Sequence, residues 1–566
     1  MKNMKKILAL VVATLMIVAS MSAFAAGDGS IIINNAVAGH TYTAYQIFSG
    51  KWDANTSKLS DIKWGTGIST AGQSALYTAY SLTGDNQTAA KVADAIGDTD
   101  ADAQAFANNI GEGANLGTGS TGDFGTGDAA TTYTIPNLED GYYMIVDTYT
   151  PASGEKDVYY ARYMIQKVGN ATVNNKADKP EVEKDIDKDN DLSTTNDRVD
   201  ENTANIGDTV TYVITSRVPD MTGYKEYYMD FSDTLSKGLT YDAGSLSVSI
   251  GGTTLAADAY TLTVGDYSDT DGTSISVHLK DLVSRQYAKD ANIVITYTAE
   301  VNDAAVIGNA GNPNTVKLIY SNNPRNSGDG TPDSGDDGVK GETPDSTVKT
   351  YVTELELVKV DKDNDTVKLA GAVFDVVGTE INKVLITGER FVEAADGTYW
   401  KLKDNKGYTT KAPNDQIKDQ YESETIKYKK EAYAETSVQE VKDVAFQVVT
   451  GSDGVIKLTG LKEGTYTFTE IQAPDGYNLL DAPITVTITS NIDTKQATAD
   501  FAWSATGAQE TATGSGKFTF TVENGQGNTL PSTGGMGTTI LYIGGSILVI
   551  LAAVLLITKR RMSSEE

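Results

Sequence analysis

Alternation of apolar and polar residues with a period of two is the dominant pattern in the chain. It recurs in short runs such as TVTYVI (209–214), IVITY (293–297) and ITVTI (484–488), which are punctuated by Gly, Asp and Asn. Successive side chains of a strand point to opposite faces, so this pattern predicts many short strands. Helical patterns are few, and the clearest runs from about Ala89 to Asn109. We therefore expect an all-β chain of stacked β-sandwiches.

Two polar breaks divide the chain into domains. The first is NNKADKP (174–180), and the second is a stretch rich in Gly, Pro and Asp at 323–349. Such composition marks turns and linkers. The sequence therefore predicts three domains, at 27–175, 176–345 and 350–527.

A repeated motif relates the first and third domains. NLEDGYYMIVDTYTP (137–151) and GLKEGTYTFTEIQAP (460–474) share Leu, Gly, Tyr, an acid and Pro at the same spacing. Such self-similarity indicates a repeated structural unit. The shared acid, Asp147 in one copy and Glu470 in the other, ends a predicted strand.

The two ends of the chain carry targeting patterns. Residues 1–26 combine lysines, an apolar run and a small-residue stretch, which is typical of a secretory signal peptide. Residues 530–566 contain LPSTG (530–534), an apolar run at 540–557 and a basic KRR tail. The apolar run is long enough to form a transmembrane helix, and the basic residues favour a cytoplasmic end. We expect an exported chain held at the cell surface by its C-terminus.

Composition excludes several classes of function. The chain has no Cys, two His and a formal net charge of −30. Nucleic acid is not an expected partner, because binding it requires a basic surface. Thiol catalysis is impossible, and two histidines leave little for zinc binding or His-based catalysis. No paired-acid motif of a hydrolase is recognisable, so we expect no enzyme activity and no cofactor.

Clusters of aspartates at 185–191 and 361–365 are the nearest approach to a metal motif. An EF-hand loop needs Gly at its sixth position and Glu at its twelfth, and neither register supplies them. We interpret the clusters as solvated acidic turns and expect no metal site.

Three polar residues end apolar strand faces in the third domain. Lys359 ends LELVK (355–359), Glu470 ends YTFTE (466–470) and Asn524 ends FTFTVEN (518–524). A buried charge without a partner is costly, so these residues would be stable inside only as a set. Desolvation lowers the pKa of a lysine and raises that of a carboxyl, which favours a neutral amine beside a protonated acid. Attack of that amine on the asparagine side chain would expel ammonia and form an isopeptide bond. Solvent-exposed strand ends are the alternative interpretation.

The third domain resembles the collagen-adhesin B-type domains from which Gram-positive pilins and surface adhesins are built. The resemblance rests on Lys359 with LAGAVFDV (369–376), on YTFTEIQAPDGY (466–477) and on Asn524. It implies that Lys359, Glu470 and Asn524 form the bond-forming triad. It also implies a tandem Ig-like architecture of collagen-adhesin A- and B-type domains.

The C-terminal segment resembles a cell-wall sorting signal. Its motif consists of Leu530, Pro531, Ser532, Thr533 and Gly534. The resemblance implies that a sortase cysteine attacks the Thr533 carbonyl and expels the chain from Gly534 onward. An amine then captures the acyl-enzyme.

The second domain resembles the related A-type pilin domain. VEK (182–184) supplies Lys184, FSDTLSKGLTY (231–241) supplies the acid Asp233, and LIYSNNP (318–324) supplies an asparagine. Strand alternation favours Asn322, with Asn314 on the same face as the alternative. In the first domain the opening strand (30–35) has no lysine, so we expect no bond there.

Polymerisation of a shaft pilin requires an acceptor lysine near the end of the first domain. The resemblance to shaft pilins points to a tyrosine-proline-lysine motif in its last strand. The corresponding segment, ATVNNKADKP (171–180), offers Lys176, although Asn175 stands where the proline is expected. Lys179 is the alternative acceptor.

Together these features resemble the fimbrial major subunit family. The resemblance implies a structural shaft subunit of a covalent pilus attached to the cell wall. The implied partners are sortase, further copies of the chain and peptidoglycan, with minor pilins and host surface molecules as further candidates. The alternative function is a minor pilin or monomeric wall-anchored adhesin that binds a host ligand.

Overall fold

The computed structural model describes residues 29–527 apart from 56–57, 127–130, 177, 189–197, 325–339, 434–437, 442–444 and 493–500. The expected signal peptide (1–26) and the whole segment 530–566, including Thr533, Gly534 and the apolar run at 540–557, lie outside the described residues. Among the helices that the structure describes, none is long and apolar enough to cross a membrane.

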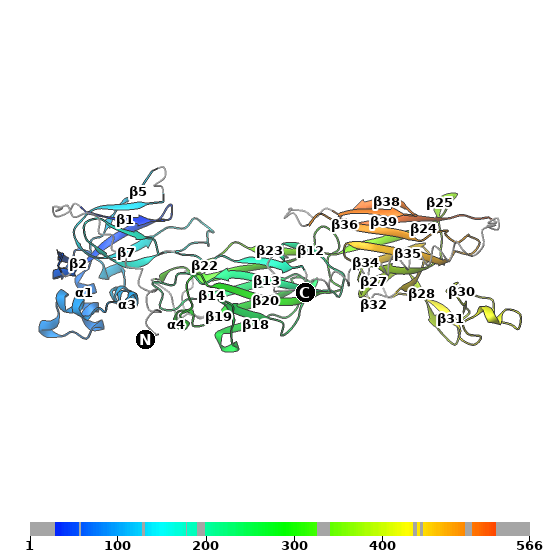
Figure 1. Cartoon of the computed structure of the whole chain (residues 1–566), viewed down its shortest axis with the longest axis horizontal. Helices are drawn as coiled ribbons and strands as arrows, with labels where there is room; N and C mark the ends of the chain where they lie inside the picture. The colour runs from blue at the N-terminus through cyan, green and yellow to red at the C-terminus, as the bar shows by residue number, and fades with distance from the viewer. Residues whose placement is uncertain are drawn as a thin grey trace, which may run out of the picture.

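Three β-rich units follow one another along the molecule (Figure 1). The first unit lies at the blue and cyan end, the second is green, and the third runs from yellow to orange. The expected all-β architecture of Ig-like domains in line is confirmed. Each unit encloses its own buried apolar core between sheets.

The first unit contains two sheets, with strand orders β5-β6-β1-β9 and β3-β2-β7-β8, and β4 pairs with β2. The core between the sheets includes Ile31, Ile33 and Tyr42. The strands are β1 (Gly29–Asn34), β2 (Thr41–Asp53), β3 (Lys58–Trp64), β4 (Ser120–Thr121), β5 (Asp123–Phe124), β6 (Tyr133–Leu138), β7 (Gly141–Thr148), β8 (Arg162–Lys167) and β9 (Ala171–Asn174).

The long helix expected at about 89–109 is wrong as a single element, because two helices cover that range. α2 (Ala89–Ala95) ends before Gly97, and α3 (Asp100–Ile110) begins at a capping box in which Thr99 and Asp102 bind each other's backbone N–H. Such a box starts a helix afresh, because it satisfies amides that a continuous helix would have paired. A further helix, α1 (Thr70–Ala79), packs with α3 in a second small core on β2, and 3₁₀ turns lie at Gly84–Asn86 and Gly113–Asn115.

The second unit is a sandwich of two seven-stranded sheets, with the main strand orders β11-β10-β13-β20-β16-β17 and β12-β23-β21-β14-β19-β18. Its core is rich in tyrosine, including fully buried Tyr212 and Tyr297. The strands are β10 (Glu183–Asp187), β11 (Arg198–Val199), β12 (Glu201–Thr203), β13 (Thr209–Arg217), β14 (Met229–Leu235), β15 (Leu239–Tyr241), β16 (Ser247–Ile250), β17 (Thr253–Thr254), β18 (Tyr260–Val264), β19 (Thr273–Leu279), β20 (Asn292–Val301), β21 (Asn312–Ser321), β22 (Lys340–Glu342) and β23 (Ser346–Tyr351). Two short helical segments, the 3₁₀ turn Ala257–Ala259 and α4 (Leu282–Arg285), complete it.

The second unit extends past the boundary expected at residue 345. β22 lies inside the polar stretch at 323–349 and β23 begins in it, yet both pair with β21. Val348 of β23 is fully buried in the core of the second unit, so the strand belongs to that unit, whereas Tyr351 at its end packs with Ile492 and Phe501 of the third unit. Polar composition predicted a linker here, whereas backbone pairing and one apolar anchor suffice to form a strand.

The third unit packs two seven-stranded sheets, β32-β27-β34-β24-β39-β38 with β25, and β31-β28-β33-β26-β35-β36-β37. A small hairpin, β29-β30, extends from its far end (Figure 1). The strands are β24 (Thr353–Asp361), β25 (Asn364–Lys368), β26 (Val373–Gly378), β27 (Lys383–Thr387), β28 (Glu389–Glu393), β29 (Trp400–Lys401), β30 (Tyr408–Thr409), β31 (Tyr428–Ala432), β32 (Val438–Glu440), β33 (Phe446–Val449), β34 (Val455–Leu461), β35 (Gly464–Gln472), β36 (Ile484–Ser490), β37 (Phe501–Thr506), β38 (Gln509–Gly514) and β39 (Lys517–Asn524), with a 3₁₀ turn at Lys418–Gln420.

Hydrogen bonds join neighbouring units. Between the first and second units, Tyr160 N–H donates to the carbonyl of Asn322 over 2.8 Å, and Tyr320 O–H donates to Asp157 Oδ1 over 2.9 Å. Between the second and third, the Asn205 side chain accepts from Lys462 N–H over 2.9 Å. These contacts help to hold the units in line.

Candidate functional site

The third unit buries a lysine, an asparagine and a glutamate at one point of its core. Lys359 on β24 and Asn524 on β39 come from the first and last strands of the unit, which pair in parallel with Lys359 opposite Val522. Glu470 comes from β35 in the facing sheet. Lys359, Asn524 and Glu470 are 0, 1 and 4% exposed. The structure therefore brings together all three residues of the expected third-domain triad.

Hydrogen bonds fix the orientation of the Asn524 amide. Lys359 Nζ donates to Asn524 Oδ1, and it also donates to the Val522 carbonyl over 3.2 Å. On the other side, Asn524 Nδ2 donates to Glu470 Oε1 and Oε2 over 3.0 and 3.1 Å. Glu470 Oε2 also accepts from Leu480 N–H over 2.9 Å. The amide thus lies between the amine and the acid.

Burial shifts the ionisation of both titratable members. It lowers the pKa of Lys359 from 10.5 to about 8, although the neighbouring Glu470 carboxylate acts in the opposite direction. It raises the pKa of Glu470, an effect that Lys359 and the hydrogen bonds from Leu480 and Asn524 oppose. Both shifts favour the neutral pair, because desolvation penalises charge.

This arrangement can form an amide bond without a cofactor. A neutral Lys359 amine lies beside the Asn524 side chain that it would attack. The nitrogen that would leave as ammonia faces the Glu470 carboxyl, which can relay the proton that this nitrogen needs. Transfer of a proton from the Lys359 ammonium to the Glu470 carboxylate leaves both buried groups uncharged.

The second unit has a lysine centre with a different geometry. Lys184 on β10 is 1% exposed, and its Nζ donates to Asp233 Oδ2 and, over 2.8 Å, to the Tyr297 hydroxyl. The hydroxyl donates to Asp233 Oδ2 over 2.8 Å. Asn314 Nδ2 donates to the same hydroxyl over 2.7 Å. Burial lowers the pKa of Lys184 to about 8, against the opposing effect of Asp233.

The structure places Asn314, and not Asn322, at this lysine. β14 and β21 pair with Asp233 opposite Val316 and Leu235 opposite Asn314, so Asn314 is a diagonal neighbour of Asp233 on the same face. Asn322 follows the other end of β21, about 26 Å along an extended strand from Asn314. There its backbone carbonyl accepts from Tyr160. The first choice of Asn322 thus gives way to the alternative, Asn314.

A second aspartate of β14, Asp230, faces away from Lys184. It lies three residues from Asp233 on β14, and therefore on the opposite face of the sheet. Its carboxylate accepts from Ser276 Oγ over 2.6 Å. Asp233 is the acid that the structure brings to the lysine.

Asp147 of the first unit contacts a histidine where Glu470 has a lysine and an asparagine. Its Oδ1 lies 2.8 Å from His40 Nδ1, and its Oδ2 accepts from Ala161 N–H. His40 stacks on Tyr149 with ring centroids 4.6 Å apart. Sequence reasoning missed His40, because it lies in a turn before β2 and no strand pattern marks it as buried.

The two candidate acceptor lysines lie just after β9. Lys176 is half-buried and follows Asn175, whose N–H donates to Asn34 O over 2.8 Å and whose side-chain amide donates to the Tyr42 hydroxyl over 3.0 Å. Lys179 forms an ion pair with Asp157. The segment that carries both lysines is thus tied to the first unit.

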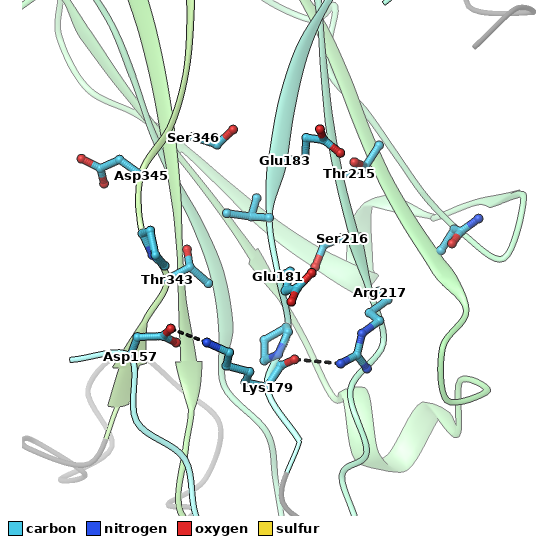
Figure 2. A pocket seen from close by; sticks show the side chains of 14 residues that line it. Asp157, Lys179, Glu181, Glu183, Thr215, Ser216, Arg217, Thr343, Asp345 and Ser346 are labelled. Carbon is cyan, nitrogen blue, oxygen red and sulfur yellow. Dashed lines mark hydrogen bonds and ion pairs between the residues drawn. The ribbon is translucent and has the colours of Figure 1, made fainter. Parts of the chain in front are cut away.

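Lys179 lines a groove of about 690 Å³ between the first and second units (Figure 2). Its ammonium points toward Asp157, and its carbonyl accepts from Arg217 over 2.8 Å. Glu181, Glu183 and Asp345 add acidic groups to the lining. Lys176 is not among the lining residues.

The acidic clusters lie only partly within the described residues. Asp361 accepts N–H bonds from Asp363 and Asn364, and it also accepts from the Tyr477 hydroxyl over 2.7 Å. Asp189 and Asp191 lie outside the described residues. Within the part of the chain that the structure describes, no group of three or more His, Cys, Asp and Glu side chains is arranged to hold a metal ion.

Three family models match consecutive parts of the chain. Residues 206–324 match the Gram-positive pilin backbone subunit 2, Cna-B-like domain, residues 353–501 match a prealbumin-like fold domain, and residues 522–564 match the LPXTG cell wall anchor motif. The first description names a Cna-B-like domain where the sequence resemblance favoured an A-type domain.

A curated relative is the trypsin-resistant surface T6 protein of Streptococcus pyogenes serotype M6. It is 26% identical over 403 residues, which cover 65% of this chain and 68% of the relative. Among solved structures, the T6 backbone pilin of that organism covers 88% of this chain and 99% of its own, at 16% identity and a TM-score of 0.49. The major pilin SpaD of Corynebacterium diphtheriae covers 88% of this chain and 98% of its own, at 16% identity and a TM-score of 0.42.

The three matches follow one another along the chain. A backbone-pilin domain is followed by a prealbumin-like domain and then by a wall-anchor motif. The relative matches across about two thirds of both sequences. Together these matches indicate a sortase-assembled backbone pilin of Gram-positive type, a structural subunit of a covalent pilus attached to the cell wall.

Proposed function

We propose that this backbone pilin is a shaft subunit whose second and third domains are each closed by an internal Lys–Asn isopeptide bond. The buried contact among Lys359, Asn524 and Glu470 carries the proposal. In the third domain, Lys359 Nζ bonds to the side-chain carbonyl carbon of Asn524, and Nδ2 leaves as ammonia. In the second, Lys184 bonds in the same way to Asn314, with Asp233 as the acid.

The position of the third-domain bond suits a protein that bears tension. Lys359 and Asn524 are 165 residues apart in sequence and lie on neighbouring parallel strands. A bond between them carries tension from the first strand directly to the last, so the chain between them is bypassed. The chain has no cysteine with which to do the same by a disulfide.

The bond also limits the freedom of the unfolded domain. By analogy with a disulfide that closes a loop of this length, the cross-link stabilises the fold by about 5 kcal/mol. Reduction cannot reverse it, because it is an amide.

Polymerisation in this proposal joins Thr533 of one subunit to a lysine of the next. Lys176 is the first choice of acceptor and Lys179 the alternative. The ion pair with Asp157 supports this order, because Lys179 must leave that carboxylate before its amine can attack. The partners are sortase, further copies of the chain and, for the last subunit, peptidoglycan. The chain itself performs no enzymatic turnover, because each internal bond forms once.

An immunoblot of cell-wall extract tests the polymeric function. A ladder of species that resist boiling in SDS is the expected result, because covalent polymers differ by whole subunits. A single band at the monomer position would contradict a shaft and favour the monomeric adhesin.

A further inference from the structure

The Tyr297 hydroxyl lies at the centre of the second-domain lysine site. It accepts hydrogen bonds from Lys184 Nζ over 2.8 Å and from Asn314 Nδ2 over 2.7 Å, and it donates to Asp233 Oδ2 over 2.8 Å. One oxygen therefore contacts the attacking nitrogen, the leaving nitrogen and the acid. Tyr297 is 1% exposed, so water has little access to this position.

Among the hydrogen bonds of the described residues, none joins a tyrosine to the third-domain triad. There the acid meets the amide directly, through the two hydrogen bonds from Asn524 Nδ2 to Glu470. In the second domain the Asn314 Nδ2 hydrogen bond runs to Tyr297 instead. The Asp233 side chain is also one methylene shorter than that of Glu470. The tyrosine hydroxyl fills the distance that the shorter acid leaves.

Ring packing holds the hydroxyl in position. Tyr297 is paired with Tyr212 across β20 and β13, and their ring centroids are 5.4 Å apart. Lys184 Nζ lies 5.0 Å from the centroid of the Tyr297 ring and 5.3 Å from that of Tyr212. Burial raises the pKa of Tyr297 well above 10, so the hydroxyl keeps its proton between transfers.

We propose that Tyr297 is a catalytic proton relay for the Lys184–Asn314 bond. The inference rests on the proposed isopeptide bond of the second domain and adds a residue to its mechanism. The neutral Lys184 amine attacks the Asn314 side-chain carbonyl carbon, and a new C–N bond forms. Nζ must then lose a proton, and Nδ2 must gain one.

The Tyr297 hydroxyl contacts both nitrogens. It can therefore accept the proton that Nζ loses and pass on the proton that Nδ2 gains. The bond from the carbonyl carbon to Nδ2 then breaks, and ammonia leaves. Asp233, which accepts the hydrogen bond of the hydroxyl, takes up a proton from the hydroxyl as Nζ gives one to it, and returns that proton through the hydroxyl to Nδ2. Tyr297 and Asp233 return to their starting forms. The net reaction is that the Lys184 amine and the Asn314 amide give a new amide and ammonia.

The Tyr297→Phe substitution in the three-domain chain (residues 27–527) tests the relay. Cell-free synthesis followed by timed intact-mass measurement records the loss of each ammonia, and peptide mapping assigns it to a domain. We expect the second-domain bond to form about 10²-fold more slowly, a typical effect of losing general acid–base catalysis. The third-domain bond should form at the wild-type rate in the same molecules, and this serves as an internal control.

Tyr241→Phe is the matched control. It removes a hydroxyl from a ring that packs edge-on against Tyr297, with ring centroids 5.8 Å apart, and this hydroxyl lies outside the hydrogen bonds that join Lys184, Asp233 and Asn314. Its second-domain bond should form at close to the wild-type rate. A wild-type rate in the Tyr297→Phe chain would overturn the relay.

A second replacement covers the case in which Tyr297→Phe fails to fold. A 3,5-difluorotyrosine in place of Tyr297 keeps the ring and the hydroxyl but makes the hydroxyl more acidic. The relay predicts an altered rate of second-domain bond formation, and an unaltered rate would overturn it. If the wild-type chain forms no second-domain bond, the proposed function of that domain fails along with the relay. If the wild-type chain forms this bond, the two Tyr297 replacements test the relay alone.

Discussion

Asn524 presents its Nδ2 to both carboxylate oxygens of Glu470, at 3.0 and 3.1 Å, while its Oδ1 accepts from Lys359. The acid therefore lies on the side of the leaving nitrogen, and the amine lies on the other. This orientation assigns Glu470 the delivery of a proton to ammonia.

Replacement of Glu470 by Ala should prevent the third-domain bond. The lysine and the asparagine remain, but the group that relays protons is lost. We expect the third domain of this variant to keep its ammonia and to lose about 5 kcal/mol of stability, measured as a lowered midpoint of denaturant unfolding. Glu463→Ala, just before the other end of β35 and outside the triad, should leave the bond intact. A cross-linked Glu470→Ala chain would contradict the role of the acid.

The choice between two asparagines is tested by single substitutions. Asn314→Ala should abolish the second-domain bond, because Asn314 is joined to Lys184 through one hydroxyl. Asn322→Ala should leave the branched peptide in place. If mapping instead finds Lys184 linked to Asn322, the proposed geometry of the second domain is wrong.

The rate of third-domain bond formation should have a maximum in pH. In the reactive form Lys359 is neutral and Glu470 is protonated. The two groups together then hold one titratable proton. Below the raised pKa of Glu470 both groups are protonated, and the amine cannot attack. Above the lowered pKa of Lys359, about 8, the pair has lost both protons, and the acid cannot donate.

Timed mass spectra of freshly synthesised chain across the pH range measure this profile. The predicted curve falls on the alkaline side of about pH 8. A rate that keeps rising above this pH would mean that amine deprotonation alone limits the reaction, and that Glu470 is not needed as an acid.

Lys176→Ala should collapse the wall-extract ladder to a monomer band. The substitution removes the proposed acceptor, yet it leaves both internal bonds and the sorting motif unchanged. Lys179→Ala is the matched variant, and it should retain the ladder, because the amine of Lys179 is held by Asp157. A ladder that persists in the double variant would exclude this segment as the junction.

The sequence predicted the third-domain site better than the second. Lys359, Glu470 and Asn524 each end an apolar strand face, and the resemblance of the flanking motifs implies their roles. Along β21 and the residues that follow it, alternation places Asn314 and Asn322 on the same face. The pattern therefore cannot show which of the two asparagines lies beside Lys184. That choice depends on the register of β21 against β14, which tertiary packing sets.

Other features depended on contacts that a linear pattern does not contain. Alternation in β20 predicts that Tyr297 points inward, but not that its hydroxyl meets a lysine from β10 and an asparagine from β21. The break between α2 and α3 depends on the capping box at Thr99. Burial of β23 depends on pairing with β21, which its polar surroundings did not indicate.

The intact mass of the three-domain chain, measured under denaturing conditions, shows most directly whether both internal bonds form. We expect a mass lower than the sequence mass by two molecules of ammonia, with peptide maps that link Lys359 to Asn524 and Lys184 to Asn314. A chain at its full sequence mass would contradict internal isopeptide bonds in both domains.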